Sequence, residues 1–419
     1  MRMKSWKVLV TIACALSFAS CNDSDNIEGG TGIKAPEPIV LNVTEQAMAS
    51  GQLDFATSFF SALYQQKGKE ENLLVSPFSL HCALGMLSNG ANGETRDAIL
   101  RTMGMEGYSQ DEVNDYFQKL MEGLNGVDPD ASVSTANSIW NNERYELLPA
   151  FCAVNSEKYK AQIEALDFTN PASVDVINAW CEEKTEGKIP KILESVDASA
   201  YVYLLNALYF KARWENEFSE GQTTSGTFHA ESGDTPAHFM HSMQIRSFVQ
   251  NELFSCTSLP YVRNAYYMYF VLPHEGVAMD DVVRAIAAPG AWNTCWKEGE
   301  VAEVNFSVPR FEIENRFELK EALRALGMEQ AFSPEADFSA LLSVPDKPSI
   351  ISSVLQASSL KVNEEGSEGA SVTAILVSTA NLPGEMKQIN FTLDRPFLFL
   401  ITESDTNTVL FMGKVGKPE

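Results

Sequence analysis

The chain is poor in the residues from which most catalytic and metal sites are built. It has 5 histidines in 419 residues, and its 7 cysteines include no pair at the CxxC spacing of zinc ribbons and thioredoxin-like redox sites. No GxSxG sequence occurs, which excludes the nucleophile elbow of the α/β-hydrolases. These absences argue against an enzyme.

The few remaining motifs stand in the wrong context for chemistry. The SxxK match at Ser358 to Lys361 lies in a strand-like segment, whereas that nucleophile belongs on a helix. His238 and His241 are three residues apart but lack a convincing third ligand nearby. The glycines of residues 29–32 neither follow a strand nor open a helix, so a phosphate-binding loop fails too. We therefore expect no enzymatic activity, no cofactor and no metal site.

Positive charge is also scarce. Lys and Arg number 31 against 56 Asp and Glu, which gives a net charge of -25. Nucleic acids and anionic membrane surfaces repel a chain of this charge, so neither is an expected partner. No concentrated basic stripe of the kind that a heparin-like polysaccharide needs is visible in the chain.

The N-terminus has the pattern of an export signal. Basic residues at Arg2, Lys4 and Lys7 precede an apolar run over residues 8–19, which is too short to favour a membrane span. Residues 18–21, Phe-Ala-Ser-Cys, resemble a bacterial lipobox with Cys21 as the lipid acceptor. The acidic residues 22–25 resemble the surface-export signal of lipoproteins from the Bacteroidetes. Lipidation is favoured over simple cleavage.

This pattern sets the expected domain organisation and location. We expect a lipoprotein signal peptide over residues 1–20, a flexible tether over 21–50 and one folded domain over 51–419. The body would be a monomer, lipid-anchored to the outer membrane and exposed at the surface or extracellular, with no other membrane contact. The remaining cysteines, odd in number and widely spaced, are interpreted as small buried hydrophobic residues.

Periodicity predicts a mixture of helices and strands in the folded domain. Helical spacing appears over residues 53–65, 77–88, 94–103, 112–124 and 174–185, and strand-like runs appear over 133–140, 201–211, 266–272, 304–311, 354–362, 389–393 and 397–401. Helices dominate early and strands late. This order favours an α+β fold with large antiparallel sheets over repeated βαβ units.

The segment from Glu364 to Asn381 is unusual for so acidic a chain. After Glu368 it contains no charge, proline or aromatic residue. If Glu368 faces water, period-two geometry turns the odd-numbered residues inward, first small ones and then Ile375 and Val377. A turn signal follows directly, so the segment has the composition of a buried strand at the place of a loop.

This segment carries a resemblance to the serpins. The residues Glu364, Glu365, Gly366, Ser367, Glu368, Gly369 and Ala370 resemble their loop hinge, and residues 391–401, FTLDRPFLFLI, resemble their C-terminal signature. Similar matches extend from about residue 54 to 416, among them residues 76–79, 90–95, 136–140, 177–180, 185–189, 205–211, 259–261, 308–311 and 337–339. The resemblance implies a serpin fold: a large antiparallel central sheet with further sheets, eight or nine helices and an exposed reactive loop.

The resemblance also assigns roles to particular residues. Ser76, Ser79 and Asn206 match polar positions that the family clusters where the central strands part, and Gln356 stands where many members have His. Glutamine can still donate and accept hydrogen bonds without titrating. Gly369 departs from the family's usual Ala and makes the loop more flexible.

The expected function is suicide-substrate inhibition. Counting from Gly366 as the family does places the scissile bond at Ala380-Asn381, with Thr379-Ala380 as the fallback. A small residue before the bond favours an elastase-like or subtilisin-like serine protease, which would become covalently attached before the cut arm enters the sheet. The alternative is a non-inhibitory binding or adhesion protein of the same fold.

Overall fold

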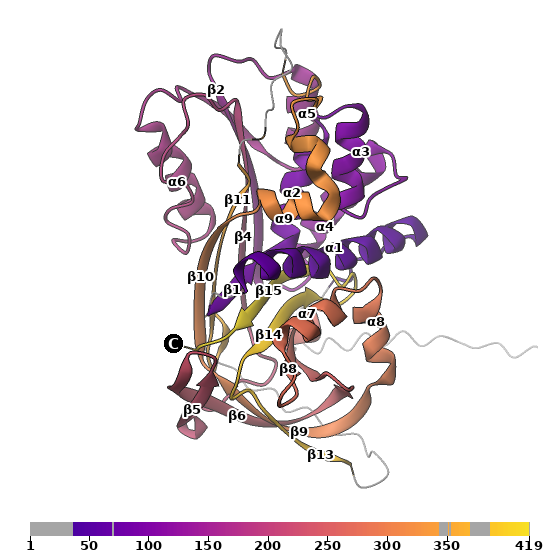
Figure 1. Cartoon of the computed structure of the whole chain (residues 1–419), viewed down its shortest axis with the longest axis vertical. Coiled ribbons are helices and arrows are strands. Elements are labelled where there is room, and N and C mark those ends of the chain that lie inside the picture. Colours follow the sequence, from indigo (N-terminus) through magenta and orange to yellow (C-terminus); the bar gives the residue numbers. More distant parts are fainter. Residues whose placement is uncertain (1–36, 69–70, 343–350, 352, 369–385, 419) are drawn as a thin grey trace, which may run out of the picture. The chain divides into compact units, whose positions relative to one another are not determined.

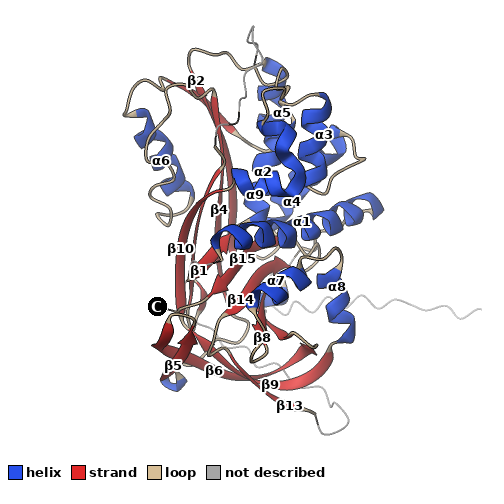
Figure 2. Cartoon of the chain, viewed as in Figure 1, coloured by secondary structure: helices blue, strands red, loops and turns tan. Residues whose placement is uncertain are grey.

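The computed structural model describes residues 37–68, 71–342, 351, 353–368 and 386–418. The described residues belong to one compact unit that extends from Ala35 to the C-terminus. Helices and strands are both abundant in it, as the α+β prediction requires (Figures 1 and 2).

A six-stranded sheet carries the segment of interest. Its strands lie in the order β10 (Phe311–Glu318), β11 (Leu355–Val362), β12 (Gly366–Ser367), β4 (Val202–Arg213), β2 (Ser132–Asn142) and β3 (Gln162–Leu166). Neighbours pair antiparallel except β2 and β3, which are parallel. The longest ladder joins β2 to β4 over ten residue pairs, so these two strands form a stiff unit.

A second sheet follows the order β1 (Asn72–Val75), β15 (Val409–Val415), β14 (Phe397–Glu403), β8 (Tyr266–Pro273), β7 (Phe254–Pro260), β6 (Gly233–Gln250), β9 (Glu300–Pro309) and β13 (Gln388–Thr392), with β5 (Thr224–Ala230) paired to β6. Every residue of β14 and β15 is buried, which explains why both are nearly continuous hydrophobic runs.

The helices begin at recognisable caps. α1 (Val43–Lys67) and α4 (Gln110–Leu124) open with capping boxes formed by Asn42 with Glu45 and by Ser109 with Glu112. The others are α2 (Pro77–Ser88), α3 (Gly93–Thr102), α5 (Pro149–Lys158), α6 (Ser173–Lys184), α7 (Met279–Ile286), α8 (Ala291–Cys295) and α9 (Lys320–Leu323). None of the helices within the described ranges combines the length and the apolar character needed to span a bilayer.

Helix α2 lies beneath the six-stranded sheet and is almost wholly buried (Figure 1). Its side chains and the even-numbered residues Leu208, Phe210 and Ala212 of β4 belong to the main hydrophobic core. The odd-numbered Leu205 and Ala207 pack on the other face, in a smaller core with α6. The sheet is therefore buried on both faces.

Two sequence predictions need correction. The boundary between tether and folded domain at residues 50 and 51 lies too late, because α1 begins at Val43 and Ile39 is already buried. The strand predicted over residues 304–311 is two strands, which meet at Arg310. The residues His238 and His241, which were not expected to bind a metal, lie on β6.

Candidate hinge and strand-insertion site

A tight turn reverses the chain between β11 and β12. The side-chain oxygen of Asn363 accepts hydrogen bonds from the backbone N–H groups of Glu365 and Gly366, at 3.1 and 3.3 Å. The backbone N–H of Asn363 donates to the carbonyl of Gly366. This is an Asx-type turn, in which the asparagine side chain hydrogen-bonds to the backbone that follows it. It directs the predicted hinge back along the sheet, between β11 and β4.

Glycine is required at position 366 because the backbone comes very close to β4. A Cβ atom there would lie 2.2 Å from the carbonyl oxygen of Ala212. Gly366 pairs with Arg213, and Ser367 pairs with both Ala212 and Val362. The hinge thus forms the first rung of an additional strand between β4 and β11.

The side chain of Ser367 points into the protein, as the period-two pattern predicts. It is fully buried, and its hydroxyl lies 2.6 Å from that of Tyr261. Tyr261 stacks on Trp214, whose indole N–H donates to the carbonyl of Asn363. The two aromatic residues therefore hold the base of the turn and the first inward-facing residue together.

Glu364 is clamped beside the turn by two other elements. Its carboxylate accepts hydrogen bonds from Arg310, at 2.8 Å from Nε, and from the hydroxyl of Thr223. The side chain is only 5% exposed. Burial by itself would raise the pKa of Glu364, but the bonds from Arg310 and Thr223 outweigh it and hold the pKa below its ordinary value.

The described part of this segment ends at Glu368. This residue has a φ of 57°, a left-handed conformation that is uncommon outside glycine and asparagine. Its carboxylate forms an ion pair with Lys188. The outward direction predicted for Glu368 agrees with this pairing.

Below the hinge, β4 and β11 are separate strands. In the part of the chain that the structure describes, they are joined only through β12. A cavity of about 60 Å³ lies between their far ends and α2. It is lined mainly by aliphatic side chains, including Leu80, Leu84, Leu87, Val202, Leu204 and Leu355.

The resemblance predicts a polar cluster where the central strands part, which we call the gate residues: Ser76, Ser79, Asn206 and Gln356. They lie around this gap in two hydrogen-bonded pairs. The amide of Gln356 on β11 makes two hydrogen bonds to the backbone of Ser76, one to its N–H (3.0 Å) and one to its carbonyl (2.8 Å). On the other side, the hydroxyl of Ser79 donates to the carbonyl of Asn206 on β4. Gln356 therefore both accepts a hydrogen bond from Ser76 and donates one to it, without a titratable group. We call this pair of bonds the clasp between β11 and α2.

Two buried polar atoms at the gap have no hydrogen-bond partner among the described residues. They are Oδ1 of Asn206 on β4 and Oγ of Ser358 on β11. Such atoms are costly to bury unsatisfied. Their positions on the two strands that face each other make the gap a site prepared for a further polar partner.

The other predicted site residues lie outside the described residues. These are Cys21, Gly369, Ala370, Thr379, Ala380 and Asn381. The sequence analysis also missed partners that the fold supplies from a distance: Tyr261, Trp214, Arg310 and Thr223 lie far from the hinge along the chain. No local pattern marks them, although Tyr261 and Arg310 stand among the residues that carry the resemblance.

No group of three or more potential ligands from His, Cys, Asp and Glu occurs in the described part of the chain. The side chains around the hinge hold the backbone of residues 363–367 against the sheet.

Comparisons with known proteins agree with this geometry. The family model described as "Serpin (serine protease inhibitor)" matches residues 50–418. The chain is 32% identical to Serpin-ZX of Hordeum vulgare over 92% of this chain and 99% of that protein. It is 30% identical to the leukocyte elastase inhibitor of Homo sapiens over 89% of this chain and 100% of that protein.

A solved structure agrees as closely. The native-state crystal structure of the thermophilic serpin tengpin superposes with a TM-score of 0.80, at 28% identity, over 92% of this chain and 97% of that one. The family model covers most of the chain, and the relatives match over nearly their full lengths. The chain belongs to the serpins, a family of protease inhibitors rather than enzymes.

Proposed function

We propose that the protein is a suicide-substrate inhibitor of serine endopeptidases whose cut reactive loop enters the gap between β4 and β11. The observation that carries this proposal is the match between the gap and the sequence of the loop. The hinge has already formed the first rung, so the register of any further strand is fixed.

Extending the ladder pairs polar residues with the two unsatisfied atoms. Six residues beyond Ser367, Thr373 would lie opposite both Asn206 on β4 and Gln356 on β11. In the same register Ser371 would lie opposite Ser358. Residues directly opposite in a sheet have Cβ atoms about 4.5–5.5 Å apart, within reach of a hydroxyl hydrogen bond.

The same register brings apolar residues to the apolar cavity. Ile375 and Val377 would lie opposite Leu204 and Val202, both of which line it. The inward face of the loop is thus small where the strands are close, hydroxylated at the polar gate and aliphatic at the cavity. A loop that served only as a loop would need none of these matches.

Insertion releases enough free energy to act on a bound protease. A strand along the 12 residues of β4 would gain roughly a dozen ladder hydrogen bonds, each contributing about 0.5 to 1.5 kcal/mol net. The sum, on the order of 10 kcal/mol, is comparable to the stability of a whole domain. It can therefore deform an attached enzyme.

The covalent step is the ordinary first half of proteolysis. The protease's serine oxygen attacks the carbonyl carbon of Ala380, and the bond to the nitrogen of Asn381 breaks as that amine takes a proton from the protease's histidine. Ala380 remains attached as an ester. If insertion then precedes attack by water, the ester is trapped.

The proposed target is an elastase-like or subtilisin-like enzyme at the bacterial surface. Ala380 suits a shallow primary pocket, and two mammalian relatives are named leukocyte elastase inhibitors. The surface location rests on the lipobox-like residues around Cys21. A leader with Cys21 changed to Ser should release the protein into the medium, whereas retention on the membrane would contradict the anchor.

The inhibitory proposal is tested by mixing the purified protein with elastase, subtilisin and trypsin. We expect an SDS-stable adduct with elastase or subtilisin and none with trypsin. In the variant Ala380→Arg the adduct should move to trypsin, because an Asp-containing pocket requires a basic residue. Clean cleavage without an adduct in every case would instead support the binding or adhesion protein, which the departure at Gly369 favours.

A further inference from the structure

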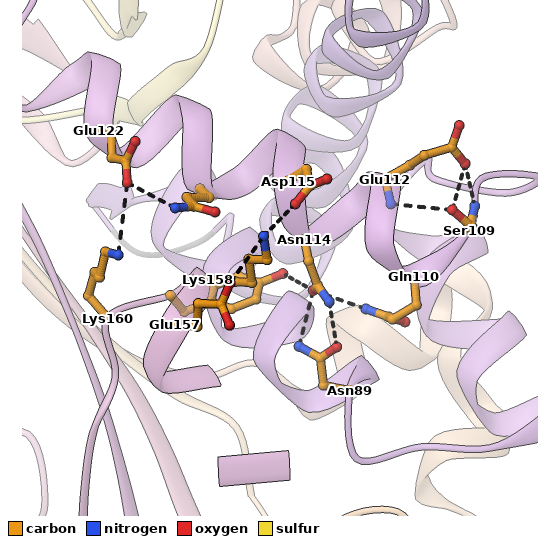
Figure 3. Close-up of polar contacts among 12 residues, drawn as sticks. Asn89, Ser109, Gln110, Glu112, Asn114, Asp115, Glu122, Glu157, Lys158 and Lys160 are labelled. Carbon is orange, nitrogen blue, oxygen red and sulfur yellow. Dashed lines mark hydrogen bonds and ion pairs between the residues drawn. The ribbon is translucent and has the colours of Figure 1, made fainter. Parts of the chain in front are cut away.

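A cluster of polar side chains, four of them amides, joins helix α5 to helices α2 and α4, and we call it the amide seam: Asn89, Gln110, Asn114, Asn155 and Tyr159. Asn89 and Asn114 exchange side-chain hydrogen bonds of 3.1 and 2.9 Å, and Gln110 donates to Asn114 (Figure 3). Asn114, Asn155 and Tyr159 are at most 1% exposed. Groups so deeply buried are tightly constrained by their partners.

One side of the seam, formed by Asn155 and Tyr159 of the α5 region, is tied to strands β4, β2 and β3. Asn206 on β4 donates to Asn137 on β2 at 2.7 Å, and Asn137 donates to the carbonyl of Tyr159, also at 2.7 Å. Tyr159 ends α5 and stands three residues before β3, which is paired to β2. Strands β4, β2 and β3 and helix α5 are therefore tied into one body.

The other side of the seam belongs to the helices beneath the sheet. Asn89 caps the end of α2 and Asn114 lies within α4. Gln110 of α4 also donates to Ser88 of α2 at 2.8 Å. The strand β11 is held to this second body by the two bonds between Gln356 and Ser76.

A few hydrogen bonds cross between the two bodies at the seam. The hydroxyl of Tyr159 donates to Asn114 at 3.1 Å, and the amide of Asn89 donates to Asn155 at 3.1 Å. Ion pairs of Lys158 with Asp115 and of Lys160 with Glu122 cross nearby at the surface (Figure 3). Gly85 makes room for this contact, since a Cβ atom there would lie 2.4 Å from the Tyr159 hydroxyl.

Parting β4 from β11 has a consequence at this seam. The strand β11 is bonded to α2 through Gln356, and β4 is tied to β2, β3 and α5, so widening the gap for a strand should slide the two bodies past each other. The bonds from Ser79 to the Asn206 carbonyl and from Asn137 to Met121 also cross between the two bodies. The ladder between β2 and β4 is too long to yield, so the displacement falls on the crossing bonds. Hydrogen bonds that depend on distance and angle do not survive such a slide.

We propose that Tyr159 and Asn155 are positioning residues for loop insertion, whose bonds to Asn114 and Asn89 resist widening of the gap between β4 and β11 and break when the strand enters. This inference rests on the proposed insertion. The seam sets part of the barrier to insertion from a place remote from the loop and the gate.

The variant Tyr159→Phe tests this with little disturbance, because it removes only the hydroxyl. Tyr116→Phe is its matched control: Tyr116 is equally buried, and its hydroxyl donates to Gln52 on α1 at 2.8 Å, within the second body. Each protein is measured intact and after its loop is cut by a metalloprotease, which forms no acyl-enzyme. Mass spectrometry confirms that the cut lies beyond Val377.

If the seam resists insertion, the two substitutions should affect the stabilities of the intact and the cut protein differently. Tyr159→Phe should lower the denaturant midpoint of the intact protein and leave that of the cut protein unchanged, whereas Tyr116→Phe should lower both. A synthetic peptide of residues 367–377 should also enter the intact Tyr159→Phe sheet about fivefold faster than wild type, the effect of losing one typical hydrogen bond. The control should show the wild-type rate.

The outcomes separate this inference from the proposed function. If cutting stabilises the wild type but Tyr159→Phe weakens both states equally, with an unchanged peptide rate, the seam is only structural and the inference is wrong. If cutting does not stabilise the wild type, loop insertion itself is wrong and the inference falls with it.

Discussion

Single residues fix the described part of the hinge against the sheet. Gly366 allows the chain to approach β4, Ser367 enters the core beside Tyr261, and Glu364 is fixed by Arg310. Glu368 has a left-handed φ of 57°. The described hinge therefore forms one rung between β4 and β11.

The substitution Gly366→Ala should destabilise this first rung. The added methyl group overlaps the carbonyl of Ala212, so we expect a loss of about 1–3 kcal/mol in the unfolding free energy of the intact protein. Gly126→Ala is the control, since its nearest contact would be 3.7 Å away and should cost little. Equal effects in chemical denaturation would contradict the close approach.

The clamp on Glu364 should depend on pH in a definite direction. Its pKa in the folded protein is lowered, so its contribution is fully present above the ordinary value of 4.5 and is lost as the pH falls through the lower folded pKa. Glu364→Gln should therefore cost about 2 kcal/mol at pH 7, and this cost should shrink as the pH is lowered from 4.5 through the lowered folded pKa. A loss that is independent of pH would show that the carboxylate charge does not matter.

At the scale of elements, the gap between β4 and β11 is governed by what lies on each side. Gln356 clasps β11 to the start of α2, and the chain Asn206–Asn137–Tyr159 ties β4 to α5. The family's common histidine would add a charge below its pKa, near 6.5. The amide here performs the same bonding at any pH.

Removing this clasp should weaken the closed sheet. Gln356→Ala leaves the N–H of Ser76 without its partner and removes one of the two hydrogen bonds to the Ser76 carbonyl, which also accepts from the N–H of Leu80; this should cost about 2 kcal/mol in the intact protein at every pH. Gln356→His should recover part of that loss at pH 8 and forfeit it near pH 5, as seen in denaturant midpoints. A pH-independent His variant would contradict the assignment of the clasp.

Charges on alternate faces of the loop should have opposite consequences. Thr373→Glu places a carboxylate opposite Asn206 inside the sheet and should abolish trapping, so that elastase cleaves the loop as a plain substrate. Val372→Glu, its neighbour on the outer face, should trap normally. The ratio of adduct to cleaved product on SDS gels measures both, and equal behaviour would refute the predicted register.

The sequence predicts elements well where one pattern persists and poorly where contacts are distant. The boundaries of α2 are predicted to the residue, because Pro77 and the apolar run mark them. The start of α1 is missed although a capping box at Asn42 and Glu45 marks it, because Met48 and Ala49 are the only buried hydrophobic residues between this cap and Leu53. Short strands such as β1 and β3 have too few residues to show a period.

The same division holds at the candidate site. The inward face of Ser367 follows from period two, and the four gate residues were found through the resemblance. Tyr261, Arg310 and the amide seam could not be predicted, because each depends on which distant strands and helices become neighbours. Asn89, Asn114 and Asn155 are three unremarkable asparagines until the fold brings them together.

At the scale of the whole molecule, the account requires two states of different stability. The intact protein has a gap lined with two unsatisfied polar atoms and an apolar cavity, and the cut loop has the side chains to fill each of them. In the proposed mechanism this free energy is released after the loop is cut, so each molecule would act once.

The most direct test compares the unfolding of intact and loop-cut protein in guanidinium chloride. We expect a large rise in the guanidinium chloride midpoint after cutting, because roughly a dozen new ladder hydrogen bonds form. The wild-type result should be lost in Thr373→Glu. An unchanged or lower unfolding midpoint in the cut wild-type protein would contradict insertion of the cut loop between β4 and β11.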